Sequence, residues 1–202
     1  MKQDSVKTIL LFRHGMTEMN ERKAYCGSID VPLSARGIAD LIEKKSLFSY
    51  PDIKGFKVVH SGMKRTLQTI KILYPNACAG AVSNSSFKEI DFGVFEGLTY
   101  EELKHRPDYK EWISGDNEAN ICPGGESGNM MKNRVLSAFS EIAEDSLSYA
   151  VFTHGGPIAC IMEYLFPEEN KNRWQWQCGF GEGYALYRQE GNGKFLHETI
   201  GF

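Results

Sequence analysis

The chain has 202 residues, of which 42% are hydrophobic and 24% are charged, and this is an ordinary composition for a folded globular protein. A chain of this length favours a single domain and can bury a substantial core without disulfides. The formal net charge of −3 argues against a nucleic-acid partner or an anionic membrane, because either would favour a basic face.

The first half of the chain predicts two pairs of a strand followed by a helix. An apolar strand over residues 7–12 precedes a helix over 31–48, in which Ser34 is suited to cap the N-terminus. A second strand is expected over 56–62. The helix after it, over 63–75, has apolar residues at spacings of three and four and stops at a proline.

The second half of the chain continues the alternation of strand and helix. Its expected elements are a helix broken at Pro107 (97–115), a turn (119–130), a helix (129–146), a third strand (148–156), a helix that begins with Pro157 (157–166), and a hairpin of two strands around Gly-Asn-Gly (183–200). No internal repeat and no interdomain linker interrupts this order. The sequence therefore predicts an α/β fold, with a single domain over 1–202, a mostly parallel central sheet and helices on both faces.

The cysteines and the N-terminal segment indicate the cellular compartment in which the protein is expected. The five cysteines are an odd number, are widely spaced and form no C-x-x-C pair, which disfavours a disulfide framework or a thiolate zinc site. The apolar run near the N-terminus has only five residues, too few for a signal peptide or a membrane span. We therefore expect reduced thiols, a cytoplasmic location and no membrane partner.

One local pattern occurs three times: an apolar strand, a small residue at its end, and a helix. The three strand ends are Arg13-His14-Gly15, Ser61-Gly62 with Arg65 just inside the next helix, and His154-Gly155-Gly156. Ligands of open α/β sheets bind beyond the carboxyl ends of the strands, so these motifs are expected at one crevice. Two arginines, two histidines and free helix N–H groups at one place favour a phosphate as the ligand.

At this point the sequence resembles a known family, the histidine phosphatase superfamily of phosphoglycerate mutase-like enzymes. The first block, LFRHGMTEMN, is similar to the family signature L-x-R-H-G-x-T-x-x-N. Four further blocks resemble the remaining family motifs in the expected order, namely SGMKRTLQT, FKEIDFGVFEG, PGGES and FTHGG. Two positions depart from the usual pattern, because Met16 stands where an acidic or polar residue is common and Phe95 where tryptophan is usual.

The resemblance implies a role for each matching residue. His14 matches the nucleophile, which becomes phosphorylated on a ring nitrogen, and Glu89 matches the general acid that protonates the leaving oxygen. The remaining matches are the residues that bind the phosphoryl group, namely Arg13, Asn20, Arg65, His154 and Gly155. The chemistry agrees, since a neutral imidazole is a capable nucleophile and phosphoryl transfer needs mainly positioning and charge neutralisation.

Two assignments have competing readings. Glu96 lies in the same segment as Glu89 and competes for the role of the acid. The stretch RWQWQCGFGEG, residues 173–183, reads either as a wall of the binding site or as aromatic packing at the sheet edge.

These observations lead to an expected function. We expect a metal-independent phosphomonoesterase without a cofactor, which acts on a small phosphorylated metabolite through a phosphohistidine intermediate. The region around 97–128 is expected to form a short lid-like insertion. Because it lacks the longer proline-rich segment of the mutases, it resembles the phosphatase branch, and within that branch the α-ribazole phosphatases, whose substrate is α-ribazole 5′-phosphate. A phosphoglycerate mutase and a non-catalytic phosphate sensor are the alternatives, and both a monomer and a homodimer remain open.

Overall fold

A six-stranded sheet organises the molecule. The computed structural model describes residues 7–116, 118–189 and 193–201. The strands lie in the order β3-β2-β4-β1-β5-β6. Their bounds are β1 Thr8–Arg13, β2 Lys57–His60, β3 Val82–Ser83, β4 Tyr149–Thr153, β5 Gly183–Arg188 and β6 Phe195–Ile200.

Most pairings in this sheet are parallel, as predicted. β1 and β2 both pair in parallel with β4, and β3 pairs in parallel with β2. β5 runs antiparallel to β1 and β6 antiparallel to β5, so the expected hairpin is present, although residues 190–192 of its turn lie outside the described residues. The two-residue strand β3 was not expected from the sequence.

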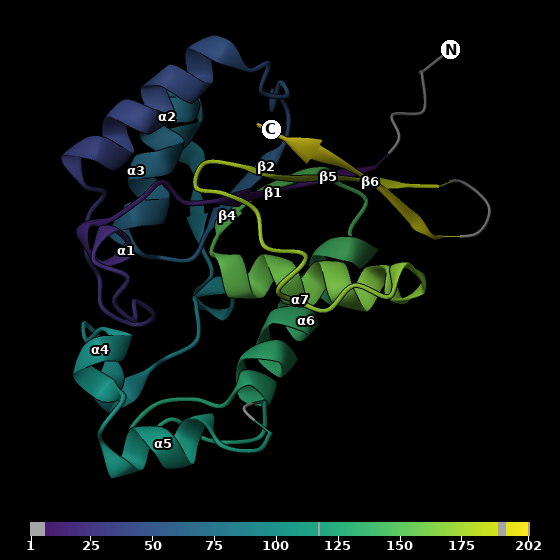
Figure 1. The fold of residues 1–202 in the computed structure, drawn as a ribbon. Coiled ribbons are helices and arrows are strands. Elements are labelled where there is room, and N and C mark those ends of the chain that lie inside the picture. Colours follow the sequence, from purple (N-terminus) through teal and green to yellow (C-terminus); the bar gives the residue numbers. More distant parts are fainter. Residues whose placement is uncertain (1–6, 117, 190–192, 202) are drawn as a thin grey trace, which may run out of the picture.

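Helices cover both faces of the sheet, which confirms the predicted architecture. Figure 1 shows α2 (Ala35–Leu47) and α3 (Lys64–Leu73) on one side of the sheet and α6 (Gly128–Glu144) and α7 (Gly155–Leu165) on the other. Ser34 caps α2 as expected, because its side chain accepts a 3.0 Å hydrogen bond from the backbone N–H of Gly37.

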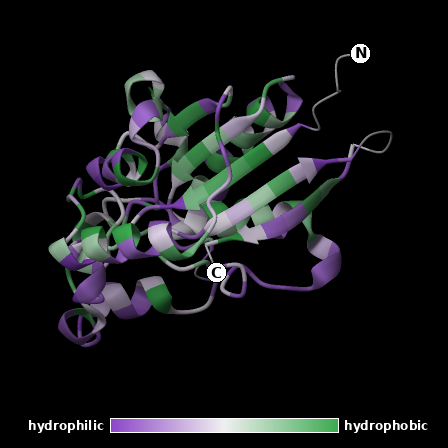
Figure 2. Cartoon of the chain, turned by 90° about the horizontal axis from the view of Figure 1, so that it is seen from above, coloured by the Kyte–Doolittle hydropathy of each residue, from purple (hydrophilic) through white to green (hydrophobic). Residues whose placement is uncertain are grey.

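The two cores follow from the alternation of side chains along β1. Leu10 and Phe12 belong to the apolar cluster under α2 and α3, whereas Ile9 and Leu11 belong to the cluster under α6 and α7. The middle strands are accordingly hydrophobic along their length, as Figure 2 shows. A strand buried on both faces is typical of a parallel sheet, and it holds the end of β1 rigidly in place.

The remaining helical segments are short. They are α1 Glu18–Glu21, α4 Tyr100–Leu103, α5 Pro107–Ile113 and the 3₁₀ turns Pro75–Gly80, Ser85–Phe87, Gly93–Phe95 and Pro167–Glu169. Figure 1 shows α4 and α5 set apart from the sheet, and they enclose a small apolar cluster of their own that includes Leu103 and Tyr109. Pro107 is the first residue of α5, so the predicted break at this proline is confirmed. None of the helices in the described ranges is long and apolar enough to cross a bilayer.

Candidate active site

The sheet brings the three sequence motifs to one place. β2, β4 and β1 are neighbours, and backbone hydrogen bonds continue past their ends, from His14 N–H to the Thr153 carbonyl (3.0 Å) and from Ser61 N–H to the Phe152 carbonyl (3.2 Å). The rings of His14 and His154 consequently lie with their centroids 5.0 Å apart.

His14 is buried, and its ring has a defined hydrogen-bond partner. Its Nδ1 lies 2.6 Å from the carbonyl oxygen of Gly15. A carbonyl only accepts, so Nδ1 carries the proton and Nε2 retains its lone pair. Burial, together with the neighbouring guanidinium groups of Arg65 and Arg13, holds the pKa of His14 well below its usual value. The ring is therefore neutral near pH 7 and presents a nucleophilic nitrogen.

Arg65 is a fully buried cation that the protein positions through carbonyl groups. Its Nη2 donates to the Gly27 carbonyl (2.7 Å), and its Nη1 donates to the Ile29 carbonyl (2.8 Å). Its Nε donates to Nδ1 of His154 at 3.3 Å. These bonds use three of the five guanidinium N–H donors, which leaves two for a ligand.

Arg13 ends β1 and is held against the loop before β5. Its Nη1 donates to the Cys178 carbonyl (2.6 Å), and its guanidinium lies over the ring of Phe180, with 4.1 Å between Cζ and the ring centroid. Its Nε is buried and has no hydrogen-bond partner. Within the described ranges no carboxylate forms an ion pair with Arg13 or Arg65. Two cations that no carboxylate compensates favour an anionic ligand.

His154 stands at the junction of β4 and α7, and protein groups occupy both of its ring nitrogens. Since Nδ1 accepts from Arg65, Nε2 carries the proton and donates to Oγ of Ser61 at 2.8 Å. Burial and the nearby charges of Arg65 and Arg13 hold the pKa of His154 well below its ordinary value. A direct contact between this ring and a phosphoryl group would replace one of these two hydrogen bonds.

The structure separates the two carboxylates that competed for the role of the acid. Glu89 is half-buried, and its Oε2 accepts a 3.0 Å hydrogen bond from the N–H of Gly156, at the start of α7. Glu96 instead accepts hydrogen bonds from the backbone N–H groups of Gly27, Ser28 and Phe92. Glu96 thus organises the loop whose carbonyls hold Arg65, whereas Glu89 points toward the helix that follows His154.

Two further residues from the sequence analysis also have defined surroundings. A Cβ atom at Gly155 would lie 3.3 Å from Cζ of Arg13, so the glycine allows the guanidinium to lie against the backbone. Asn20 forms a capping box at α1, in which its Oδ1 accepts from the N–H (3.1 Å) and the hydroxyl (2.8 Å) of Thr17. These bonds use the amide oxygen of Asn20, so its amide nitrogen is the group that a phosphate would engage.

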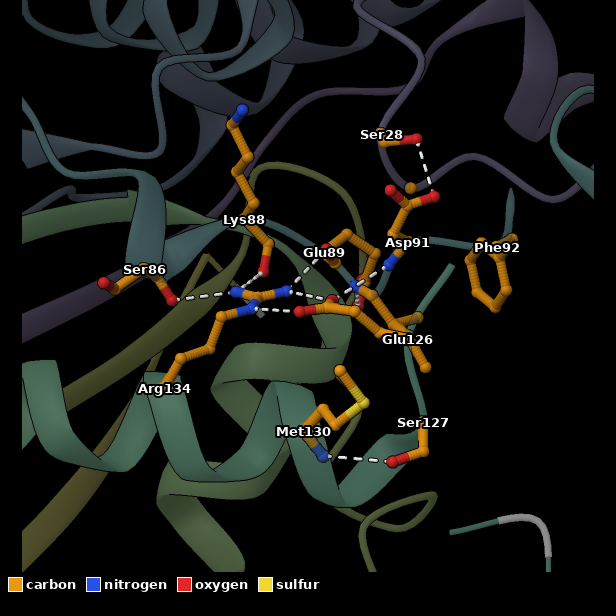
Figure 3. Close-up of polar contacts among 12 residues, drawn as sticks. Ser28, Ser86, Lys88, Glu89, Asp91, Phe92, Glu126, Ser127, Met130 and Arg134 are labelled. Atoms are coloured by element: carbon orange, nitrogen blue, oxygen red, sulfur yellow. Dashed lines mark hydrogen bonds and ion pairs between the residues drawn. The ribbon is translucent and has the colours of Figure 1, made fainter. Parts of the chain in front are cut away.

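Sequence reasoning missed the residue that holds the Glu89 segment. Arg134 on α6 donates from Nη1 to the carbonyls of Ser86 (2.9 Å) and Lys88 (2.8 Å), and from Nη2 to the carbonyl of Glu89 (2.9 Å). The same guanidinium binds both carboxylate oxygens of Glu126, from Nε at 2.8 Å and from Nη2 at 2.7 Å (Figure 3). Glu126 belongs to the PGGES block, but no local signal marked Arg134, because the carbonyls that it binds lie 45 to 48 residues away in the chain.

Comparisons with known proteins identify the family. The profile of the histidine phosphatase superfamily (branch 1) matches residues 9–199, so the chain belongs to this superfamily of phosphatases.

Individual relatives carry several names. Phosphoglycerate mutase-like protein 4 of Arabidopsis thaliana is 29% identical over 174 residues, which cover 81% of this chain and 73% of that protein. The mouse 6-phosphofructo-2-kinase/fructose-2,6-bisphosphatase 1 is 31% identical over 168 residues, which cover 81% of this chain and only 34% of the bifunctional protein.

Solved structures share the fold. The alpha-ribazole phosphatase of Shigella flexneri superposes with a TM-score of 0.82 at 21% identity, over 96% of each chain. The phosphoglycerate mutase of Bacillus anthracis superposes with a TM-score of 0.73 at 20% identity, over 98% of this chain and 93% of that one. At these identities the likeness concerns the fold alone.

Proposed function

We propose that the protein is a metal-independent phosphomonoesterase in which His14 is the nucleophile and Glu89 the general acid. The observation that carries the proposal is the neutral, buried His14, whose Nδ1–H is bound to the Gly15 carbonyl. Burial and the charges of Arg65 and Arg13 hold its pKa low, and neither arginine has a carboxylate partner within the described ranges. This arrangement suits attack on a phosphate dianion, because the arginines neutralise charge that would otherwise repel the nucleophile.

In the first step the Nε2 lone pair of His14 forms a bond to phosphorus. The ester P–O bond breaks, its electron pair leaves with the alcohol oxygen, and protonated Glu89 gives that oxygen a proton. Arg13 and Arg65 bind the phosphoryl oxygens as negative charge spreads over them. The bond from Nδ1–H to the Gly15 carbonyl stabilises the positive charge that develops on the imidazole ring.

In the second step water attacks phosphorus and passes a proton to a phosphoryl oxygen, and Glu89 takes up a proton again from solvent. The P–N bond breaks, its electron pair returns to Nε2, and inorganic phosphate leaves. The charge neutralisation that a divalent ion supplies in many phosphoryl transferases comes here from the two guanidinium groups.

The proposed substrate is a small phosphorylated metabolite, with α-ribazole 5′-phosphate as one candidate. Support for this candidate is the shared fold with a phosphatase of that name and the resemblance of the short 97–128 region. A phosphoglycerate mutase is the main competing activity, because relatives carry that name. The five free cysteines fit reduced surroundings, and we propose a cytoplasmic enzyme.

The test is rapid quench with a labelled phosphate ester, followed by measurement of acid-labile phosphate on the protein. Wild type and Glu89→Gln should both accumulate label, whereas His14→Ala should carry none. Glu89→Gln should turn over an alkyl phosphate about 10²–10⁴-fold more slowly than wild type, with a much smaller loss on nitrophenyl phosphate, whose leaving group needs little protonation. Label on His14→Ala would overturn the assignment of the nucleophile. Interconversion of phosphoglycerates without phosphate release would favour the mutase.

A further inference from the structure

A cavity of about 260 Å³ lies directly beside Glu89. On one side it is lined by α5, through Trp112 and Ile113, and on the other by the loop after α7, through Arg173 and Trp174. It is smaller than most drug-sized pockets, which measure about 300–1,000 Å³, so it fits one small ring system. Glu89 forms part of its wall, so a group in the cavity lies beside the carboxyl group that is proposed to protonate the leaving oxygen.

Four of the eleven residues that line this cavity are aromatic, namely Tyr25, Phe92, Trp112 and Trp174. The ring centroid of Tyr25 lies 4.8 Å from that of Phe92 and 5.7 Å from that of Trp112. The hydroxyls of Tyr25 and Tyr109 lie 2.7 Å apart and form a hydrogen bond, which fixes the Tyr25 ring before any ligand binds. Trp174 stands at the rim and is 67% exposed, an unusual position for a large apolar side chain.

Two polar features limit what the cavity accepts. Arg173 is the one basic residue among the lining residues in the described ranges, and its Nη1 already donates to Glu118 at 2.7 Å. The charge of Arg173 is therefore already paired with that of Glu118, so a carboxylate on the ligand would not meet an uncompensated cation. The Nε1–H of Trp112 is buried without a hydrogen-bond partner and is not exposed to a ligand, so Trp112 contributes its ring and no hydrogen bond to the cavity.

We propose that this cavity is the leaving-group subsite and that it selects phosphate monoesters whose alcohol carries an uncharged aromatic or heteroaromatic ring. The proposal rests on the proposed function, because it takes Glu89 as the acid. The aromatic rings of the lining favour stacking with a ring of the ligand, and the pairing of Arg173 with Glu118 leaves no uncompensated cation for anionic groups such as the carboxylate of a phosphoglycerate. The 97–128 segment then supplies a wall of the subsite through α5.

The test compares benzyl phosphate with cyclohexylmethyl phosphate, which have similar leaving-group basicity and ring size but differ in aromaticity. Wild type should prefer the benzyl ester by about two- to tenfold in kcat/KM, the range that aromatic pairing supplies. It should process 3-phosphoglycerate more slowly than either ester. Trp112→Leu and Trp174→Leu keep an apolar side chain but remove the ring. In each variant the ratio of kcat/KM for benzyl phosphate to kcat/KM for cyclohexylmethyl phosphate should be close to one.

Tyr164→Leu is the matched control, because Tyr164 is also an exposed aromatic residue but lies on α7 outside this cavity. Its ratio should equal that of wild type. The exposure of Trp174 means that its variant tests the subsite even if Trp112→Leu folds poorly. A wild-type ratio near one, or an unchanged ratio in Trp174→Leu, would overturn the subsite while leaving the phosphatase mechanism intact. Failure of the proposed function would look different, as an absence of acid-labile phosphate with nitrophenyl phosphate.

Discussion

At the scale of single residues, the site keeps two histidines uncharged next to two arginines. His14 and His154 are both buried, and both have pKa values well below the ordinary 6.5, with burial as the main cause and the Arg65 charge next. A histidine that protonates less readily in the folded protein makes stability depend on pH. The unfolded chain takes up protons on these rings below about pH 6.5, whereas the folded protein does so only at lower pH.

Stability should therefore fall as pH drops below about 6.5, and it should level off only below the folded pKa values. Each ring contributes a slope of up to about 1.4 kcal/mol per pH unit in the free energy of unfolding. This slope is measured by urea unfolding of wild type, His14→Asn and His154→Asn at several pH values between 7.5 and 5. Each variant should show a smaller slope than wild type, because it lacks the contribution of one ring. His105→Asn, in an exposed turn, is the control. Equal slopes in all four proteins would show that the buried rings take up protons as readily as exposed ones.

Gly156 permits a second prediction at this scale. A Cβ atom here would lie 2.2 Å from Oε1 of Glu89. This carboxylate is the far end of a flexible side chain. Gly156→Ala should therefore displace the carboxylate without unfolding the protein. We expect a melting temperature close to that of wild type and a turnover of alkyl phosphates lower on the order of 10²-fold, the usual cost of losing or misplacing an acid. Gly80→Ala, where a Cβ meets nothing within 4 Å, should behave as wild type. Normal turnover in Gly156→Ala would place the acid elsewhere.

At the scale of elements, α6 and the segment before the acid are joined by one side chain. The guanidinium of Arg134 donates hydrogen bonds to the backbone carbonyls of Ser86, Lys88 and Glu89. It also binds the carboxylate of Glu126 (Figure 3). Removing the guanidinium leaves these carbonyls and a half-buried carboxylate without their donor. Glu89 should then lose its fixed position, although it keeps its own carboxylate.

The variant Arg134→Met keeps the apolar stem and removes this clamp. Turnover of an alkyl phosphate should fall at least about tenfold more than turnover of nitrophenyl phosphate, because only the former needs a well-placed acid. Lys132→Met on the same helix removes a weaker pair, with 3.4 Å between Nζ and the Glu163 carboxylate, and should leave the ratio unchanged. If Arg134→Met slows both substrates equally, Arg134 has a general structural role and does not position the acid.

The sequence predicted these elements to different extents. The apolar run of β1 and the cap at Ser34 are local signals, and both proved correct. The capping box of Thr17 and Asn20 spans four residues, so the same spacing suits a helix cap and a phosphate ligand equally well, and α1 went unpredicted. Arg134 and the aromatic cavity could not be predicted, because their contacts join segments far apart in the chain and depend on how the helices pack.

Trp174 and Trp176 illustrate the same limit within one short stretch. The sequence left open whether this stretch lines a site or packs against the sheet. The structure buries Trp176 in the core next to Tyr184 and leaves Trp174 at the rim of the cavity. The packing interpretation is therefore confirmed for Trp176, whereas the binding-site interpretation concerns Trp174 and rests on the proposed subsite.

At the scale of the whole molecule, an acidic protein encloses a cationic site. The net charge is −3, yet Arg13 at the end of β1 and Arg65 on α3 both act on the buried His14 and have no carboxylate partner within the described ranges. An anion that binds only the folded state raises the free energy of unfolding by RT ln(1 + [L]/Kd), or about 2.7 kcal/mol at a hundred times Kd. Vanadate and inorganic phosphate should therefore stabilise the protein.

Arg13→Met and Arg65→Met should remove most of this stabilisation, because each takes away one of the two cations that would bind the anion. Thermal unfolding with and without vanadate, in excess chelator throughout, measures the shift. Arg36→Met is the matched control, since Arg36 is an exposed arginine on α2 whose only described ion pair is with Asp40 one turn away. The chelator should leave both the vanadate shift and the turnover of nitrophenyl phosphate unchanged. A shift that persists in Arg13→Met and Arg65→Met would place the anion elsewhere, and loss of turnover with chelator, restored by a divalent ion, would contradict the metal-independent mechanism.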